Sequence, residues 1–207
     1  LGALPDAGTA LASDPTGRWL VAGTQKGIVS VFECEEKDEF LLSESAKLHE
    51  GAVTALLFEP EELRFLSAGA DLKLLLTHAR GKLEPEDRGR GGMHEDIVTS
   101  IAHGPGERFF TGSRDGTCKN WSRSDRTRPS TQSEGVVSVV GLAVLEIHAR
   151  PHLVVAGHDS TLRFFLLDAA GKFGPAVHRL HGALAGARHE LSEREPTRRE
   201  SALKKLA

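Results

Sequence analysis

The feature that most constrains the fold of this chain is a sequence unit of about 44 residues that occurs four times. One landmark of the unit is a tight-turn position, which is held by Lys26, Asp71, Asp115 and Asp159. A second landmark lies six residues later and is held by Phe32, Thr77, Trp121 and Phe165. In both sets the successive intervals are 45, 44 and 44 residues. Because two landmarks keep one period, the sequence predicts a repeat protein.

The segment Arg108–Trp121 indicates what each unit folds into. It begins with an apolar pair, continues through small residues to an Asp115-Gly116 turn, and ends in an alternating stretch. This order is typical of a strand, a hairpin turn and a second strand. A period of this length with four strands in each unit predicts an all-β chain, in which four four-stranded antiparallel sheets are the blades of a propeller.

On these residues the chain resembles a WD-repeat β-propeller, over roughly residues 7–182. In that family a His before the first strand, a Ser or Thr on the second strand, an Asp in the next turn and a Trp on the third strand form a buried hydrogen-bonded set. The third unit fills these places with His94, Ser113, Asp115 and Trp121. The resemblance implies a structural role for them. A catalytic His-Asp pair is the alternative, but no Ser or Cys nucleophile recurs beside it at a usable spacing.

The other units fill the set only in part. The second keeps His49 and Asp71, with Gly69 and Thr77 in the remaining places. The fourth keeps Asp159, with Ser133, Gly157 and Phe165. The first keeps only Thr24, with Lys26 and Phe32. We therefore expect His49, Asp71 and Asp159 to join the structural set, and the first unit to lack it.

The period also predicts the organisation of the chain. We expect blades at residues 1–48, 49–93, 94–132 and 133–181. Residues 182–207 change to a spacing of three to four residues, which predicts short helices. This tail is similar in style to a HEAT-like helical repeat, and a helical cap on the propeller is the alternative.

Four blades form an open arc, which would expose apolar flanks that soluble proteins avoid. We expect the four blades to be part of a larger ring, with further blades upstream of Leu1. A four-bladed ring and a dimer that closes the ring are the alternatives. Because the sequence begins with Leu instead of Met, we also expect it to be a piece of a longer chain.

Composition excludes several classes of protein. The formal net charge is −3, whereas a nucleic-acid surface normally needs a basic face. No apolar run reaches the length of a membrane span. The only cysteines, Cys34 and Cys118, lie two units apart without the paired spacing of a zinc site, which favours a reducing, cytoplasmic location.

The ten histidines do not predict a metal site. The closest pairs are His178 with His181 and His148 with His152, and these spacings do not converge on strands and loops. We therefore expect no metal, no cofactor and no small-molecule substrate. The sequence does not predict an enzyme.

Function is then expected to reside on the surface. In propellers of this family, partners most often bind the face that carries the turns between second and third strands and the loops that enter each blade. Those places hold Gln25, Lys26, Glu50, Glu95, Asp96, Arg114 and His158. The leading hypothesis is a non-catalytic scaffold that binds a protein or peptide. A regulatory or sensory domain attached to an enzyme is the alternative, and an enzyme that uses histidines at the propeller centre is a third.

Overall fold

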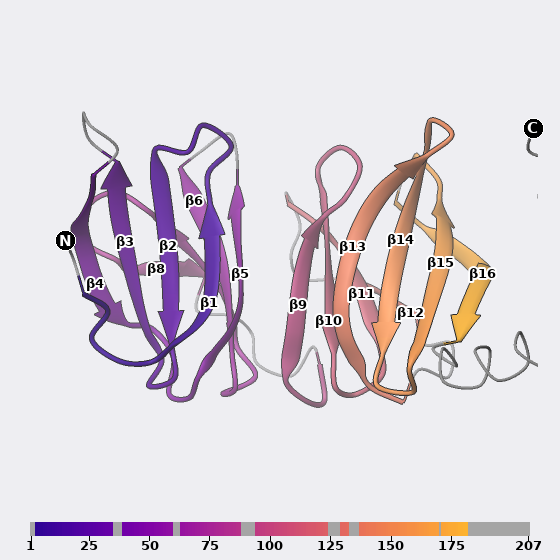
Figure 1. Cartoon of the computed structure of the whole chain (residues 1–207), viewed down its shortest axis with the longest axis horizontal. Helices are drawn as coiled ribbons and strands as arrows, with labels where there is room; N and C mark the ends of the chain where they lie inside the picture. The colour runs from indigo at the N-terminus through magenta and orange to yellow at the C-terminus, as the bar shows by residue number, and fades with distance from the viewer. Residues whose placement is uncertain are drawn as a thin grey trace, which may run out of the picture.

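A computed structural model of the chain describes residues 3–34, 39–59, 63–87, 94–123, 129–132, 137–169 and 171–181. Sixteen β-strands form four antiparallel four-stranded sheets, and no helix occurs within these ranges (Figure 1). The predicted all-β class with four blade sheets is confirmed. The helical segment predicted for residues 182–207 lies outside the described residues, as does Ser133.

We number the sheets as blades in chain order. The first blade contains β1 (Gly8–Ser13), β2 (Trp19–Thr24), β3 (Ile28–Cys34) and β4 (Phe40–Lys47). The second contains β5 (Val53–Glu59), β6 (Arg64–Gly69), β7 (Leu74–His78) and β8 (Pro85–Asp87). The third contains β9 (Val98–His103), β10 (Arg108–Ser113), β11 (Cys118–Ser122) and β12 (Ser130–Gln132). The fourth contains β13 (Val139–Ile147), β14 (Arg150–Gly157), β15 (Thr161–Leu167) and β16 (Phe173–His181).

Strands pair in chain order within every blade, so each blade is a simple meander. In each blade the pairing between the first two strands shifts register once, close to the same turn. The shifts lie at Gly8/Ala10, Val53/Ala55, Gly112/Ser113 and Val139/Gly141. Such an irregularity increases the local twist of a sheet. The repeat seen in the sequence is therefore also present in the strand register of each blade.

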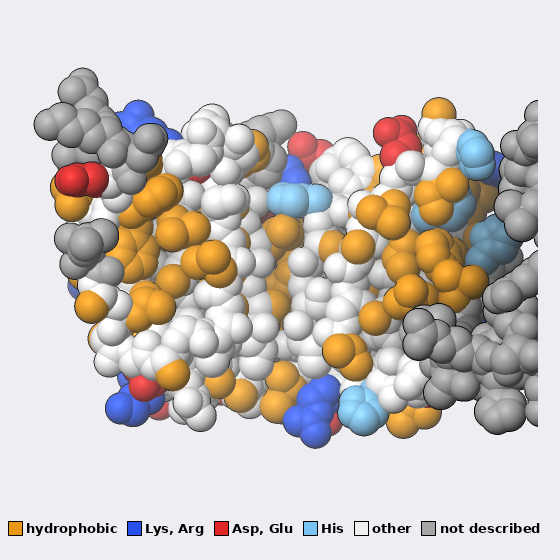
Figure 2. Space-filling model, in the orientation of Figure 1, with side chains coloured by type: hydrophobic (Ala, Val, Ile, Leu, Met, Phe, Trp, Pro, Cys, Tyr) orange, Lys and Arg blue, Asp and Glu red, His pale blue; other side chains and the backbone are white. Residues whose placement is uncertain are grey.

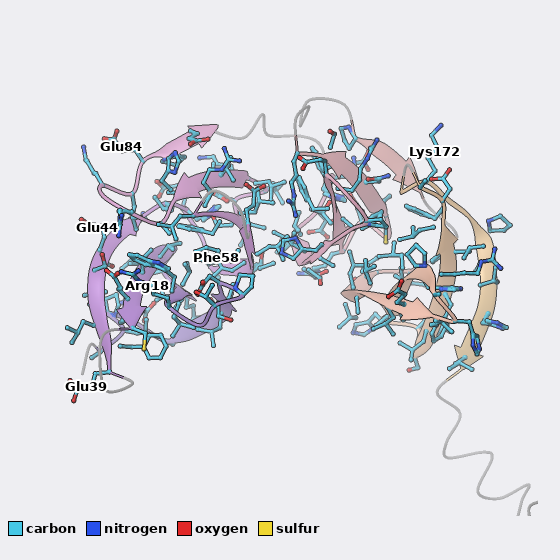
Figure 3. All side chains as sticks on the ribbon, turned by 90° about the horizontal axis from the view of Figure 1, so that it is seen from above. Arg18, Glu39, Glu44, Phe58, Glu84 and Lys172 are labelled. Atoms are coloured by element: carbon cyan, nitrogen blue, oxygen red, sulfur yellow. The ribbon has the colours of Figure 1, made fainter. Side chains whose placement is uncertain are left out.

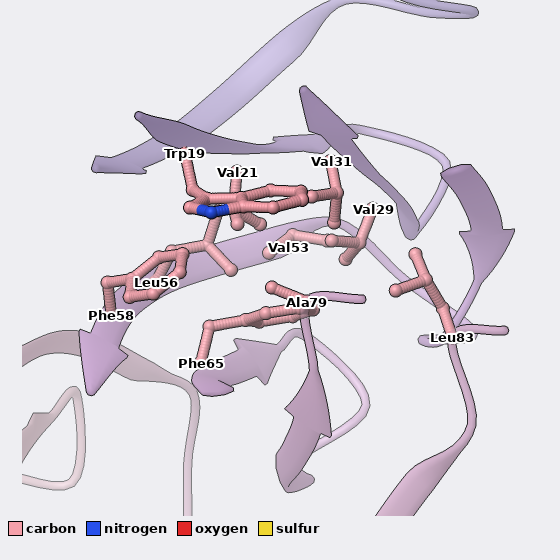
Figure 4. Close-up of a cluster of buried hydrophobic side chains, with 10 residues drawn as sticks. All are labelled: Trp19, Val21, Val29, Val31, Val53, Leu56, Phe58, Phe65, Ala79 and Leu83. Atoms are coloured by element: carbon pink, nitrogen blue, oxygen red, sulfur yellow. The ribbon is translucent and has the colours of Figure 1, made fainter. Parts of the chain in front are cut away.

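The hydrophobic core lies between blades, because a single sheet has no interior of its own. Three clusters of buried apolar side chains occupy the three junctions between neighbouring blades. At the first junction, Trp19, Val21 and Val31 face Val53 and Phe65 of the second blade (Figure 4). The second strand of each inner blade thus buries apolar side chains on both of its faces, as Phe65 and Leu66 of β6 and Phe109 and Phe110 of β10 show.

The other two junctions are rich in aromatic side chains. The second junction contains Leu76, Phe109 and Trp121, and the two aromatic rings stack with centroids 5.8 Å apart. The third contains Phe165 and Phe173, whose rings meet edge to face with centroids 5.5 Å apart. Aromatic pairs in such geometries add to the stabilisation from burial.

The blades follow a curved path, and the first and fourth blades lie at its two ends (Figure 3). The first strands of neighbouring blades touch in succession, from β1 to β5, from β5 to β9 and from β9 to β13. This contact places the first strands on the inner side of the curve. The turns between second and third strands then lie together at one end of the sheets, at the lower edge of Figure 1.

Candidate functional site

The four turns between second and third strands share one backbone geometry. The residue after the turn landmark has a positive φ in every blade: Gly27 80°, Leu72 64°, Gly116 81° and Ser160 59°. The residue before the landmark donates its backbone N–H to the lead-in of the first strand, and these donors are Gln25, Ala70, Arg114 and His158. Their bonds are 2.8 to 2.9 Å long. The landmarks therefore occupy matching bends, which we call the turn face.

In the third blade a buried hydrogen-bond network supports this bend. Nδ1 of His94 lies 3.0 Å from Oδ2 of Asp115, and Nε2 lies 2.7 Å from the hydroxyl of Thr111. The indole N–H of Trp121 donates to the same Thr111 oxygen over 2.8 Å. Asp115 also accepts from the backbone N–H of Glu95 at 2.9 Å. The network therefore joins the loop that enters the blade, the second strand, the turn and the third strand.

The directions of these bonds follow from the chemistry of the groups. An indole N–H can only donate, so the Thr111 oxygen accepts from Trp121 and its own proton is directed to Nε2 of His94. Nδ1 of His94 then carries the ring proton and donates it to Asp115. Burial lowers the pKa of His94, and hydrogen bonding to Asp115 offsets this only in part. His94 is therefore neutral at pH 7.

The Asp115 carboxylate is strongly held in its ionised form. Burial alone would raise the pKa of Asp115, but hydrogen bonds from Thr117 and from the backbone of Glu95 lower it to about 2. Thr117 donates both its backbone N–H, at 2.8 Å, and its hydroxyl, at 2.6 Å. Asp115 thus holds the turn by accepting several hydrogen bonds at once.

Ser113 does not occupy the place that the sequence predicted for it. The hydroxyl between His94 and Trp121 belongs to Thr111. Ser113 lies at the register shift of β10 and donates to the carbonyl of Asp96 over 2.9 Å. It also accepts the backbone N–H of Asp115 at 3.1 Å. It therefore supports the turn beside the network and does not link the histidine to the tryptophan.

The second blade repeats the first half of this network. Nδ1 of His49 lies 2.9 Å from Oδ1 of Asp71, and Nε2 lies 2.9 Å from the hydroxyl of Ser67. Burial lowers the pKa of His49, with a partial offset from Asp71. Ser67, and not Gly69, supplies the hydroxyl. Gly69 is needed for space, because a Cβ there would lie 2.3 Å from Nδ1 of His49.

The second half of the network is missing in this blade. Thr77 stands at the position of Trp121 and is fully buried. Its hydroxyl has no hydrogen-bond partner among the described residues. A buried polar group without a partner costs about 1 to 3 kcal/mol.

In the fourth and first blades, other interactions than a His-Asp pair occur at the same bend. Asp159 accepts from the Thr161 hydroxyl at 2.6 Å and from the Arg163 guanidinium at 2.7 Å. The Arg163 and Thr161 hydrogen bonds lower the pKa of Asp159 to about 2. In the first blade Lys26 projects into solvent, and its ammonium lies 4.0 Å from the Asp6 carboxylate.

Thr24 accepts the backbone N–H of Ile28 over 3.1 Å. Within the described residues, neither the first nor the fourth blade has a His-Asp pair at this bend. Gly157 pairs with Val139 in the fourth blade and contributes no side chain to the bend.

The predicted partner-binding residues all lie on or beside the turn face. Gln25, Lys26, Glu50, Glu95, Arg114 and His158 are exposed, and Asp96 is half-buried. Glu50 pairs with Lys47 at 2.7 Å, and Arg114 lies 4.0 Å from Asp96. Lys, Arg and His side chains are visible along this edge of the molecule (Figure 2). The surface is therefore polar and carries both signs of charge.

Sequence reasoning missed Thr111, Ser67 and Arg163. A signal for the first two was present, since each lies four residues before the turn aspartate of its blade. Arg163 lies four residues after Asp159, and in the other blades this position holds Ser30, Leu75 and Lys119, so no arginine recurs there.

Two further features are absent from the part of the chain that the structure describes. No group of three or more potential metal-ligating side chains comes together there. Nor does that part contain a helix with the length and apolar character needed to cross a membrane.

A comparison with known protein families identifies one repeat, and it coincides with the third blade. Residues 92–122 match the family model described as WD domain, G-beta repeat. The match begins just before His94 and ends just after Trp121, so it spans the complete network. No curated protein matches the chain.

Proposed function

We propose that this chain, which carries a WD40 repeat in the third of its four blades, is a non-catalytic scaffold whose turn face binds a protein or peptide. WD40 domains generally bind protein partners. Here the scaffold would consist of the sheets and the junctions between them. The recognition residues would be the exposed residues of the turns.

One observation carries the proposal: the four bends are alike in backbone geometry and unlike in exposed side chains. Each bend has a positive φ at the same position and an equivalent N–H bond to the lead-in of the first strand. The residues before the landmark are nevertheless Gln25, Ala70, Arg114 and His158. A rigid backbone with variable exposed side chains is well suited to selective recognition, because its rigidity limits the conformational entropy lost on binding.

The buried histidines support a structural interpretation over a catalytic one. His49 and His94 are 1% and 5% exposed, and each uses both ring nitrogens in hydrogen bonds. A general base needs an open nitrogen within reach of a substrate proton. Neither ring offers one in this arrangement.

Affinity capture with the tagged protein tests the proposal. The variants Arg114→Glu and His158→Ala change exposed turn residues, so we expect each to lose at least one partner that the parent protein retains. Glu107→Arg is a matched control, because Glu107 is exposed in the third blade at the opposite end of β10. Captured proteins are compared by quantitative mass spectrometry.

The control should retain the full set of partners. Equal melting temperatures for all variants would exclude unfolding as the cause of a loss. If both turn variants captured the same proteins in the same amounts as the parent, the turn face would not be the binding surface.

A further inference from the structure

Exposed apolar side chains are concentrated at the two ends of the arc. Among the described residues, twelve large hydrophobic side chains are exposed, and eleven of them lie in or beside the first and fourth blades. They include Leu11 and Leu42 in the first blade and Leu145, Leu162 and Leu180 in the fourth. Of the residues that the structure describes in the second and third blades, only Leu72 belongs to this set, and it lies on the turn face.

The exposed flank of the first blade has the character of an interior surface. Leu11 lies three residues into its strand, as Leu56 and Ile101 do in the next two blades. Those two are 8% and 9% exposed because the preceding blade covers them, whereas Leu11 is 65% exposed. The first blade therefore presents the face that the other blades turn towards their predecessor.

The fourth blade presents the opposite kind of face. Leu162 and Phe164 lie three and five residues after Asp159, as Leu74 and Leu76 lie after Asp71. Leu76 is 1% exposed because the third blade covers it, whereas Phe164 at the matching position is only half-buried. Leu74 is half-buried, whereas Leu162 at its matching position is 40% exposed. The fourth blade therefore presents the face that the other blades turn towards their successor.

The described residues of the four blades thus leave one face of each kind uncovered. The two faces are complementary in the same way as the paired faces at the three internal junctions. Both faces open to the same side of the molecule, and hydrophobic side chains cover both (Figure 1, Figure 2). They lie at opposite ends of the arc, so one copy does not close on itself (Figure 3). A second copy related by a two-fold axis would cover both.

We propose that the occupant of these faces is a second copy of this chain. The fourth blade of each copy packs on the first blade of the other, and eight blades close one ring. Each new junction continues the series of existing ones, with apolar side chains at matched positions on both sides. This pairing would bury the exposed leucines without requiring a different partner.

Close contacts at the internal junctions predict which two residues meet at the junction between the two copies. A Cβ on Gly23 would lie 2.5 Å from Val53, and a Cβ on Gly112 would lie 2.5 Å from Val139. Each glycine lies three residues before a turn landmark. Each valine is the first residue of the first strand in the next blade. The corresponding residues at the free faces are Ala156 and Gly8.

Sedimentation of the purified protein tests the pairing. We expect twice the mass of one chain, with a dissociation constant raised at least about ten-fold by Leu11→Asp or by Leu162→Asp. Leu72→Asp is the control, because Leu72 has a similar exposure of 38% but lies on the turn face. Circular dichroism checks that the variants are folded.

A disulfide test locates the contact. We expect an equal mixture of Gly8→Cys protein and Ala156→Cys protein, both in a Cys34→Ser background, to form a cross-linked dimer on mild oxidation. Each variant alone should not cross-link, because the two positions meet only across the junction. Burial raises the pKa of Cys118 to about 12, so that thiol does not compete.

A parent protein that sediments as a single chain would overturn the proposal. This is the result expected if further blades of the same chain cover the faces. A dimer unaffected by both flank variants, or one without the mixed cross-link, would overturn it as well.

Discussion

The second and third blades share a His-Asp pair but complete it differently. In the third blade the chain of hydrogen bonds runs from Trp121 through Thr111 and His94 to Asp115. In the second blade it stops at Ser67, and Thr77 is buried without a hydrogen-bond partner in the described structure. The two blades therefore differ in one interaction while the fold around it is the same.

The difference shows which part of the network the two blades have in common. Both blades keep the bond from histidine to aspartate, which ties the loop that enters the blade to the turn. Only the third adds the indole, which ties the third strand to the second. We infer that the His-Asp pair is sufficient to form the bend, and that the tryptophan adds stability to one blade.

The largest expected effect comes from the two aspartates. Asp115→Ala removes the acceptor for His94, Glu95 and Thr117, so we expect a loss of about 2 to 3 kcal/mol in the free energy of unfolding. Asp71→Ala should cost less, about 1 to 2 kcal/mol. Its backbone donors lie farther away, at 3.1 and 3.3 Å, than those of Asp115, at 2.9 and 2.8 Å. Urea titration of each variant measures both losses.

Lys26→Ala is the matched control at the same bend of the first blade. The Lys26 side chain is 76% exposed, so its loss should change stability by less than about 0.5 kcal/mol. A loss as large as that of Asp115→Ala would contradict the role given to the turn carboxylates. Equal losses for Asp71→Ala and Asp115→Ala would remove the difference between the two blades.

A second pair of variants should have opposite signs. Thr77→Val replaces an unpartnered hydroxyl with a methyl of similar shape, and should raise stability by about 1 kcal/mol. Thr111→Val leaves the Trp121 N–H and the His94 ring without their partner, and should lower stability by about 1 to 2 kcal/mol. Thermal and urea unfolding of both variants measure the difference. Changes of the same sign would show that Thr77 has a partner in solution.

Much of the fold could be predicted because the repeat landmarks report backbone geometry. The turn landmarks kept their spacing, and the structure places all four in equivalent bends. Asp115 and Asp71 could be identified for the same reason, since a short acidic side chain in such a turn accepts nearby N–H groups. The family resemblance added the histidines, which lie far from the turns in sequence.

The hydroxyl of the network was predicted two residues too late, although Thr111 and Ser67 share a spacing of four residues before the turn aspartate. Thr111 and Ser113 lie two residues apart on β10 and therefore share one face of the strand, so alternation along the strand does not distinguish them. Ser113 was therefore predicted where Thr111 stands. Arg163 was missed because, among the described turns, only Asp159 pairs with an arginine four residues later.

The smallest effect tests the charge of the two carboxylates. The pKa of Asp115 in the folded chain is about 2, against about 3.9 for an unfolded aspartate. The stability that its charge contributes is therefore complete above about pH 4 and is lost as the pH falls towards 2.

The pKa of Asp71 is lowered too, and hydrogen bonds to His49 and to the Glu50 backbone overcome the opposing effect of burial. Because the backbone N–H groups that bind Asp115 are closer, the penalty of Asp115→Ala should persist to lower pH than that of Asp71→Ala. Urea titrations at pH 7, 5, 4 and 3 compare the two penalties. If the Asp115→Ala penalty stayed constant from pH 5 down to pH 3, the ionised state of this carboxyl would not be what stabilises the third blade.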